Sequence, residues 1–345
     1  MPLKSLRIAV LHYQAKDDPP DPVVAQVSAA LRAAGHEPVD LRVDESVSDL
    51  VRQLTRARAD LVFNLCETFA EDYRLEVNVA AVLELARVPF TGSGTAGLLL
   101  AQDKVLTKQL LQFHGVLTPR FATFDGISFQ ANGDLSFPLV VKPARSDASM
   151  GLGVEKDMEG LARRVKRIRE EYDDEALAEE FIEGRELYVG VVGDAAKPEV
   201  LPVVELDFGS RWNRKRMKIA NREVKFGPET PGSPHLVLPT DLSDELQGRI
   251  GRAAVTAFRA LKLRDYARID FRVSSRTNEP YLLEVNPNPY LETQCEVAMG
   301  AKERGLSYEA LVQRIVETAA RRHGLGVASR ATPGAPARDA APAPH

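Results

Sequence analysis

The first third of the chain alternates between strand-like and helix-like segments, and this alternation restricts the possible folds more than any other feature. The strand-like segments are residues 6–11, 37–43 and 60–65, and the helix-like segments are residues 23–34, 47–58 and 75–87. Alternating strands and helices are typical of a parallel sheet with helices on its faces. We therefore expect an open α/β domain that ends near residue 100.

The remainder of the chain mixes the two patterns. Strands are expected at residues 138–142, 186–192, 200–206, 267–273 and 281–285, and helices at residues 103–114, 158–171, 243–262 and 307–322. Residues 176–183 fit neither pattern clearly, and residues 210–234 resemble a long loop rich in Lys, Arg, Pro and Gly. From Val327 the chain is rich in Ala and Pro, and we expect this tail to be disordered.

Composition excludes several classes of protein. The chain has 345 residues, a length that predicts about two domains. Its two cysteines, Cys66 and Cys295, are too few for a disulfide framework or a zinc-finger site. A net charge of −4 argues against a nucleic-acid-binding protein, and no apolar run is long enough to span a membrane. The N-terminal apolar stretch is too short for a signal peptide, so we expect a soluble, cytoplasmic protein.

Two short strands near residue 280 carry the strongest chemical signal. Because side chains alternate between the faces of a strand, residues 267–273 place Asp270 on a polar face, and residues 281–285 do the same for Glu284, with Asn286 following. If the strands pair as a hairpin, two carboxylates and an amide oxygen converge, and these are suitable ligands for Mg²⁺. The rigid NPNP segment that follows fixes the direction of Asn286. The alternative is the solvated outer face of an edge hairpin.

A lysine at the end of an apolar strand is the second signal. Lys142 ends FPLVVK, and a loop of small residues follows from Ala144 to Gly153. The backbone N–H groups of Ser149, Met150 and Gly151 are placed to cradle phosphates, with Lys142 supplying a positive charge. The segment has no Walker A motif. The alternative is a lysine beside a Gly-rich turn on the surface.

Two further segments allow two interpretations each. Asp103 and Lys104 open a helix. Either Lys104 contacts a phosphate, or the pair has no ligand and Asp103 stabilises the start of the helix through the helix dipole. Residues 179–186 (EEFIEGRE) are a strand edge followed by Gly184 and the acid Glu186. In such a segment the backbone groups can bind an adenine ring and the carboxylate of Glu186 can bind a ribose. The alternative for this second segment is a charged linker.

A basic segment lies within the expected long loop. It is a lid over a polyphosphate, a nucleic-acid-binding stripe or a solvated surface. Its members are Arg211, Arg214, Lys215, Arg216, Lys218, Arg222 and Lys225.

In their order along the chain, these signals resemble the ATP-grasp superfamily and, within it, the D-alanine–D-alanine ligase branch. The order is Asp103-Lys104, VVKP with its small-residue loop, EEFIEGRE, the basic loop, ARIDFR and YLLEVNPNP; PFTGSGTAGLLLAQDK and AEDYRLE add to the likeness. The likeness extends from about Val62 to Gly324. It implies a fold of mixed α/β and α+β class, in which an N-terminal open α/β (Rossmann-like, pre-ATP-grasp) domain precedes a two-lobed ATP-grasp fold. The implied domains are residues 1–100, 101–183 and 184–326, with the tail at 327–345.

The resemblance also implies roles for individual residues. Lys104 and Lys142 would contact the ATP phosphates, under a flexible loop that contains Ser149, Met150 and Gly151. A hinge would hold adenine, with Glu186 on the ribose; the hinge residues are Glu179, Glu180, Phe181 and Ile182. Asp270, Glu284 and Asn286 would bind two Mg²⁺ ions, or Mn²⁺. Arg268 would stabilise the transferring phosphoryl group, and Lys218 would lie near the γ-phosphate.

The activity that this resemblance implies is ATP-dependent formation of an amide bond. Phosphorylation turns a carboxylate, whose own leaving group is poor, into an acyl phosphate that an amine attacks, with release of ADP and phosphate. Positive groups neutralise the charge that develops on the phosphoryl oxygens, and a closed lid keeps water out. The implied partners are a small carboxylate and a small amine, such as an amino acid or a short peptide, and the family suggests a homodimer.

Four features on the substrate side depart from the D-alanine–D-alanine ligase pattern. In the loop after the third strand, Cys66 replaces the histidine of a His-Gly pair, and Tyr73 replaces the last glycine of a GEDG stretch. Further along the chain, Pro289-Tyr290 stands in place of the Pro-Gly of a Ser-Pro-Gly turn, and Cys295 replaces a serine. The first-strand loop, residues 12–18, lacks the acid that holds the substrate amine in the family. We therefore expect a ligase with a different donor or acceptor. The alternatives are a D-alanine–D-alanine ligase of cell-wall precursor synthesis and a non-catalytic ATP-binding protein.

Overall fold

The chain begins with a parallel sheet covered by helices. The computed structural model describes residues 3–15, 18–125, 129–147, 149–209, 212, 217–221, 224 and 232–325. The first elements are β1 (Arg7–Tyr13), α1 (Pro22–Ala33), β2 (Glu37–Val43), α2 (Val47–Ala57), β3 (Leu61–Asn64), the 3-10 turn η1 (Tyr73–Leu75) and α3 (Glu76–Leu85). The sheet order is β2-β1-β3, and both pairings are parallel. The carboxyl ends of these strands meet at one edge, which is where open α/β sheets place ligands.

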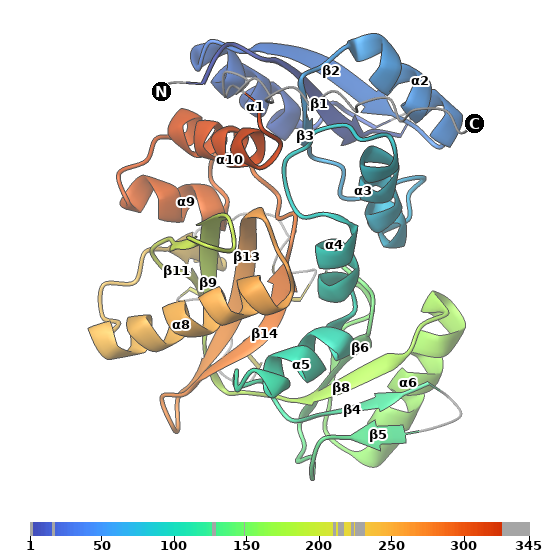
Figure 1. Cartoon of the computed structure of the whole chain (residues 1–345). Helices are drawn as coiled ribbons and strands as arrows, with labels where there is room; N and C mark the ends of the chain where they lie inside the picture. Colours follow the sequence, from blue (N-terminus) through green and yellow to red (C-terminus); the bar gives the residue numbers. More distant parts are fainter. Residues whose placement is uncertain are drawn as a thin grey trace, which may run out of the picture.

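The second sheet is antiparallel and has α6 packed against it (Figure 1). Its order is β5-β4-β8-β6-β7. The elements are β4 (Phe121–Phe124), β5 (Phe129–Ala131), β6 (Leu139–Pro143), β7 (Gly153–Glu155), α6 (Met158–Tyr172) and β8 (Ala176–Glu180). Alternate apolar residues of β6 and β8 pack on Leu161 and Ile168 of α6, so one face of this sheet forms a small core of its own.

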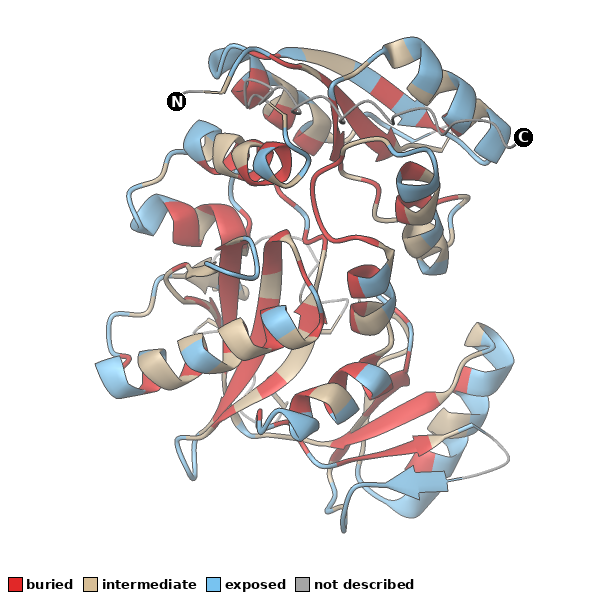
Figure 2. Cartoon of the chain, viewed as in Figure 1, coloured by how far each residue is buried: buried red, intermediate tan, exposed pale blue. Residues whose placement is uncertain are grey.

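The third sheet is the largest and lies next to the second (Figure 1). Its order is β12-β11-β9-β13-β14, and β10 also pairs with β9. The elements are β9 (Gly184–Gly193), β10 (Glu199–Val200), β11 (Val204–Asp207), β12 (His235–Val237), α8 (Asp244–Ala260), β13 (Asp265–Ser274) and β14 (Pro280–Asn286). Helix α8 and helices α4 (Thr95–Gln102) and α5 (Lys104–Phe113) contribute to its core, which Figure 2 shows as buried residues along the strands.

The two ends of the chain share one core. Helices α9 (Glu296–Glu303) and α10 (Tyr308–Arg322) follow the third sheet, and α10 packs on α1 of the N-terminal domain. This core joins Ile8 and Val27 to Tyr266 and Ile315. Arg322 of α10 pairs with the buried carboxylate of Asp265, which also accepts a hydrogen bond from the Gly92 N–H at 2.8 Å.

This architecture confirms the expected fold class, an open α/β domain followed by two α+β lobes. The uncertain segment 176–183 begins with strand β8, and α4 runs across residue 100 without a break. Helices α4 and α9 and strands β4, β5, β7 and β12 were not expected. Most of the expected loop at 210–234, and the tail from Val327, lie outside the described residues.

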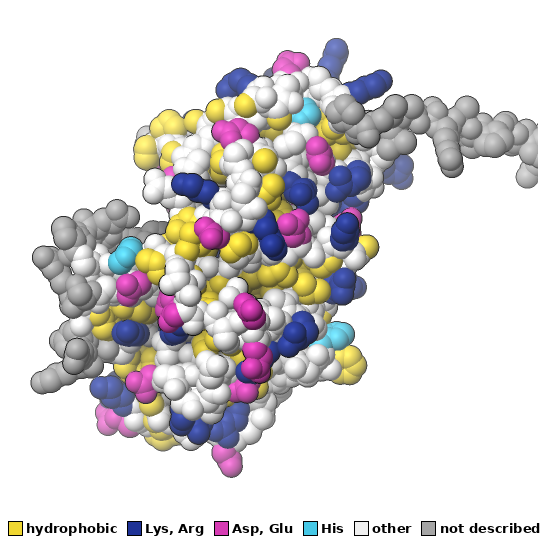
Figure 3. All heavy atoms as spheres, turned by 90° about the vertical axis from the view of Figure 1, so that its left-hand side faces the viewer, with side chains coloured by type: hydrophobic (Ala, Val, Ile, Leu, Met, Phe, Trp, Pro, Cys, Tyr) yellow, Lys and Arg dark blue, Asp and Glu magenta, His cyan; other side chains and the backbone are white. Residues whose placement is uncertain are grey.

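The described surface carries both signs of charge. On the face at the left of Figure 1, basic and acidic side chains are interspersed (Figure 3). Within the described residues no helix is long and apolar enough to cross a membrane.

Candidate active site

Two neighbouring cavities meet at Glu284. The first lies between the second and third sheets, encloses about 590 Å³ including its mouth, and is lined by Lys142, Ser149, residues 179–182, Glu186, Asp270 and Glu284, among others. The second encloses about 480 Å³ and lies between the end of β14 and the loops of the N-terminal domain. Glu284 lines both cavities, so a ligand in one lies next to a ligand in the other.

The buried carboxylate of Glu179 forms ion pairs with two lysines beside the first cavity. The side chains of Lys108 and Glu179 are 0% and 4% exposed and form an ion pair, and Lys142 Nζ lies 2.8 Å from Glu179 Oε2. Burial alone would lower the pKa of Lys142, but the carboxylates of Glu179 and Glu284 outweigh it and raise that pKa. Lys142 therefore presents a permanent positive charge to the cavity. The sequence analysis did not identify Lys108, whose Nζ also donates to the Leu283 carbonyl oxygen at 3.0 Å.

Asp270, Glu284 and Asn286 lie together on paired strands. In the β13–β14 ladder, Asp270 is opposite Glu284 and Arg268 is opposite Asn286. The Asn286 amide donates to Asp270 Oδ2 at 3.3 Å. This grouping follows from strand alternation, because every second side chain of each strand faces the cavities.

Basic side chains hold the two carboxylates. Arg268 donates to both oxygens of Asp270, at 2.8 and 3.0 Å, and its NH1 lies 3.4 Å from Glu296 Oε2. Lys104 Nζ lies 3.1 Å from Glu284 Oε1, and Asp103 caps helix α5 by accepting the N–H groups of the next turn. Asp103 therefore stabilises the helix start, as one of the two interpretations expected, and the phosphate contact of Lys104 stays a prediction.

The remaining predicted residues of the first cavity occupy one end of it. Glu186 accepts from Arg272 at 3.1 Å and from the Tyr188 hydroxyl at 3.2 Å. The predicted hinge covers the end of β8 and the start of the link to β9, where the Phe181 N–H donates to the Pro138 carbonyl oxygen and Glu180 pairs with Arg120. Within the described residues the Ile182 N–H makes no hydrogen bond, so this donor is open to a ligand.

The small-residue loop closes over the first cavity from the second sheet. Ser149 Oγ donates to the carbonyl oxygen of Ala220 at 2.9 Å. Because Ala220 lies between β11 and β12, this bond links the loop to the third sheet. The Met150 N–H donates to the Asp147 carbonyl oxygen at 3.0 Å and is already engaged. Gly151 has φ +67°, and a Cβ there would lie 2.9 Å from the Pro143 ring, so the turn requires glycine.

Lys218 does not line either cavity. Its side chain is exposed, and its Nζ lies 5.9 Å from the centre of the Phe208 ring, while its carbonyl oxygen accepts from Arg272 at 2.7 Å. The other members of the predicted basic loop lie outside the described residues; they are Arg211, Arg214, Lys215, Arg216, Arg222 and Lys225.

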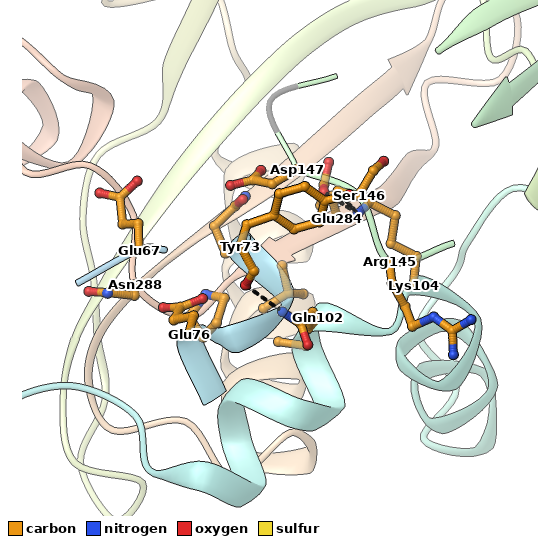
Figure 4. A pocket seen from close by; sticks show the side chains of 14 residues that line it. Glu67, Tyr73, Glu76, Gln102, Lys104, Arg145, Ser146, Asp147, Glu284 and Asn288 are labelled. Atoms are coloured by element: carbon orange, nitrogen blue, oxygen red, sulfur yellow. Dashed lines mark hydrogen bonds and ion pairs between the residues drawn. The ribbon is translucent and has the colours of Figure 1, made fainter. Parts of the chain in front are cut away.

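Acidic residues that the sequence analysis did not identify line the second cavity. Figure 4 shows Glu67, Glu76 and Asn288 on one side of it and Lys104 with Arg145 on the other. Burial, together with the charges of Asp147 and Asp21, raises the pKa of Glu67 to about 8. Burial also raises the pKa of Glu76 well above its ordinary value, although Asn288 donates a hydrogen bond to it.

The substrate-side departures have definite places in the structure. Tyr73 lines the second cavity, whereas Cys66 is fully buried and its Sγ donates to the Thr68 carbonyl oxygen at 3.0 Å. Tyr290 donates its hydroxyl to Asp21 at 2.7 Å, across the boundary with the N-terminal domain. Cys295 is buried at the start of α9. Burial raises the pKa of both thiols to about 12, so neither is suited to act as a nucleophile.

Comparison with known proteins identifies the family. The model for the D-ala D-ala ligase C-terminus matches residues 110–317. A D-alanine–D-alanine ligase of Bordetella petrii is 34% identical over 302 residues, which are 85% of each chain. The chain belongs to the D-alanine–D-alanine ligase family. Protein y4sG of Sinorhizobium fredii, which bears the name "uncharacterized", is 35% identical over 321 residues, 90% of this chain and 92% of that protein.

Solved structures of this ligase family share the fold. A D-alanine–D-alanine ligase of Bacillus anthracis complexed with ATP has a TM-score of 0.73 at 23% identity, and covers 93% of this chain and 99% of its own. The VanG D-Ala:D-Ser ligase of Enterococcus faecalis has a TM-score of 0.69 at 19% identity, and covers 92% of this chain and 100% of its own. Family membership confirms the expectation of an ADP-forming, ATP-dependent ligase that makes an amide bond.

Proposed function

We propose that this ligase activates a small carboxylate as an acyl phosphate in the second cavity, using ATP bound in the first, and joins it to an amine. The observation that carries the proposal is the shared position of Glu284. A metal-binding carboxylate at the boundary of two cavities lies where the γ-phosphate of a nucleotide on one side meets a carboxylate on the other. A non-catalytic ATP-binding role is not favoured, because Arg268 and the three metal-ligand candidates are all present and adjacent.

We assign the nucleotide to the first cavity residue by residue. Adenine would lie against the hinge at 179–182, where the Ile182 N–H is open, and its ribose against Glu186. Lys142 from the first cavity and Lys104 from the second would hold the phosphates, because both ammonium groups interact with Glu284, which lines both cavities. Arg268, fixed by Asp270 and Glu296, would stabilise the negative charge that develops during transfer.

The donor set fits a divalent cation. Asp270 and Glu284 offer carboxylates and Asn286 an amide oxygen, which are hard ligands of the kind that Mg²⁺ or Mn²⁺ prefers. Within the described residues no cluster of three or more His, Cys, Asp or Glu side chains would hold a metal alone, so phosphate oxygens and water would complete the shell of the one or two ions. A bound cation would neutralise the phosphate charge that otherwise repels the attacking carboxylate.

The substrates are proposed to differ from two D-alanines. Curated relatives carry the name D-alanine–D-alanine ligase, but here Tyr73, Glu67 and Glu76 are among the residues that line the second cavity. We also propose action in the cytoplasm as a homodimer, with domains at 1–100, 101–183 and 184–326. Sedimentation of the purified protein tests the dimer.

The test is an ADP-release screen with amino acids and short peptides. Glu284→Gln is isosteric and removes one metal-binding charge, so we expect at least about a hundredfold loss of ADP release with retained circular dichroism. Glu303→Gln, an exposed site on α9, is the matched control and is expected to retain full activity. Equal turnover by both variants would contradict the proposed site. Release of ADP with D-alanine alone would make the protein a D-alanine–D-alanine ligase.

A further inference from the structure

The second cavity holds two carboxylates for which the protein supplies no counter-ion. Glu67 and Glu76 line the same wall, together with Asn288 (Figure 4). Within the described residues, no lysine or arginine forms an ion pair with either of them. Glu76 Oε1 is fully buried and has no hydrogen-bond partner, although the Asn288 side chain does bond to this carboxylate. A buried carboxylate oxygen without a partner is costly to stability, and here it lies in the wall of a cavity.

The nearby basic groups are already engaged by other acids. Arg268 attracts Glu67, but its guanidinium donates to both oxygens of Asp270 and lies 3.4 Å from Glu296. Lys104 contacts Glu284 at 3.1 Å, on the opposite side of the cavity. Arg145, which also lines this cavity, pairs with Asp174 at 2.8 Å. Within the described residues, therefore, no basic side chain of the cavity pairs with Glu67 or Glu76.

We infer that the second cavity binds a positively charged group of the substrate, an ammonium or a guanidinium, at the carboxylates of Glu67 and Glu76. This inference rests on the proposed function, because it treats the second cavity as the substrate site. The reacting end of the substrate lies at Glu284 and Asn286, and the charged group lies at the opposite wall.

Two parts of an amino acid can supply this charge, the α-ammonium or a basic side chain. Paired probes separate them. Arginine and citrulline differ in the charge of the side chain, and norleucine and 2-hydroxyhexanoate differ in the charge of the α-substituent. Each pair has nearly the same shape, so a difference in affinity within a pair reports charge.

The experiment measures binding by calorimetry, with Mg²⁺ and a non-hydrolysable ATP analogue present. In the wild type we expect the charged member of at least one pair to bind about tenfold more tightly or better, as a desolvated charge pair implies. Glu76→Gln and Glu67→Gln should each reduce that ratio to about twofold or less. Glu303→Gln, on the exposed side of α9, should leave it unchanged. Circular dichroism of each variant confirms that it is folded.

Equal affinity within both pairs, no binding of any charged probe, or full discrimination by both Gln variants would overturn the inference. The first result would mean that Glu67 and Glu76 stay protonated when a ligand binds and therefore take a neutral group. If charged probes bind in a Glu76-dependent way but no amine ever elicits ADP release, the ligase proposal fails and the cation site stands. If ADP is released only with uncharged substrates, the ligase proposal stands and the cation site fails.

Discussion

The raised pKa of Glu67 leads to a prediction about stability that needs no knowledge of the substrate. Burial first, and then the charges of Asp147 and Asp21, raise this pKa from 4.5 to about 8, with Arg268 acting in the opposite direction. Between these two values the folded protein binds more protons than the unfolded chain, so its free energy of unfolding falls as the pH rises. Glu67→Gln removes the group that titrates. The variant should therefore gain stability relative to the wild type as the pH increases.

The size of the gain follows from the two pKa values. One pKa unit corresponds to about 1.4 kcal/mol, so a rise from 4.5 to about 8 amounts to roughly 5 kcal/mol when Glu67 is fully ionised. Roughly 3.5 kcal/mol of this develops between about pH 5 and about pH 8. Because solvent in the open cavity screens the charge, we expect the variant to gain about 1–3 kcal/mol over that range.

Urea denaturation followed by circular dichroism at several pH values measures this gain. The decisive quantity is the change with pH of the difference between the variant and the wild type, because any packing effect of the substitution is the same at every pH. Glu303→Gln is the matched control and should give a difference that does not change over the range. A Glu67→Gln difference that is equally flat, or that falls as the pH rises, would refute the assignment of a desolvated, protonated Glu67.

Two further predictions concern buried ion pairs, and both are measured as free energies of unfolding. Lys108→Met leaves the buried carboxylate of Glu179 with one ammonium group instead of two and should lower the free energy of unfolding by about 3–5 kcal/mol. A decrease below about 1 kcal/mol would show that Lys142 alone is enough to neutralise Glu179. Arg322→Ala removes the ion-pair partner of Asp265, which is 0% exposed, and should cost about 3 kcal/mol. In that case Arg322→Lys should recover part of the loss, and an equal loss in both variants would point to packing instead of charge.

The periodic segments of the fold could be predicted because their pattern depends only on local geometry. Alternation with a period of two fixes the face of Asp270 and Glu284 whatever else the strands contact. Helix α4, with the sequence TAGLLLAQ, is short and apolar on every side, so it has no periodicity to detect. Strands β4 and β5 are four and three residues long and give an equally weak signal.

The site was less predictable where it depends on contacts between sheets. Lys108 reads as one more polar residue of an amphipathic helix, and only the packing of α5 against β8 and β14 brings it to Glu179. Glu67 had a signal that the sequence analysis did not use. It lies three residues after the end of β3, and the carboxyl ends of parallel strands in open α/β sheets are where ligands bind. Glu76 had no comparable signal, because an acid in the first turn of a helix is common.

The core shared by α1 and α10 has a consequence for how the protein is made. The β1–β3 sheet leaves the ribosome well before α10, yet apolar residues such as Val27 find their partners, such as Ile315, only when α10 has been synthesised. Contacts so distant in the chain form slowly, and until then an apolar surface stays open to other molecules. Nascent chains shortened before α10 should therefore need chaperones, and completion of α10 should be the step that releases them.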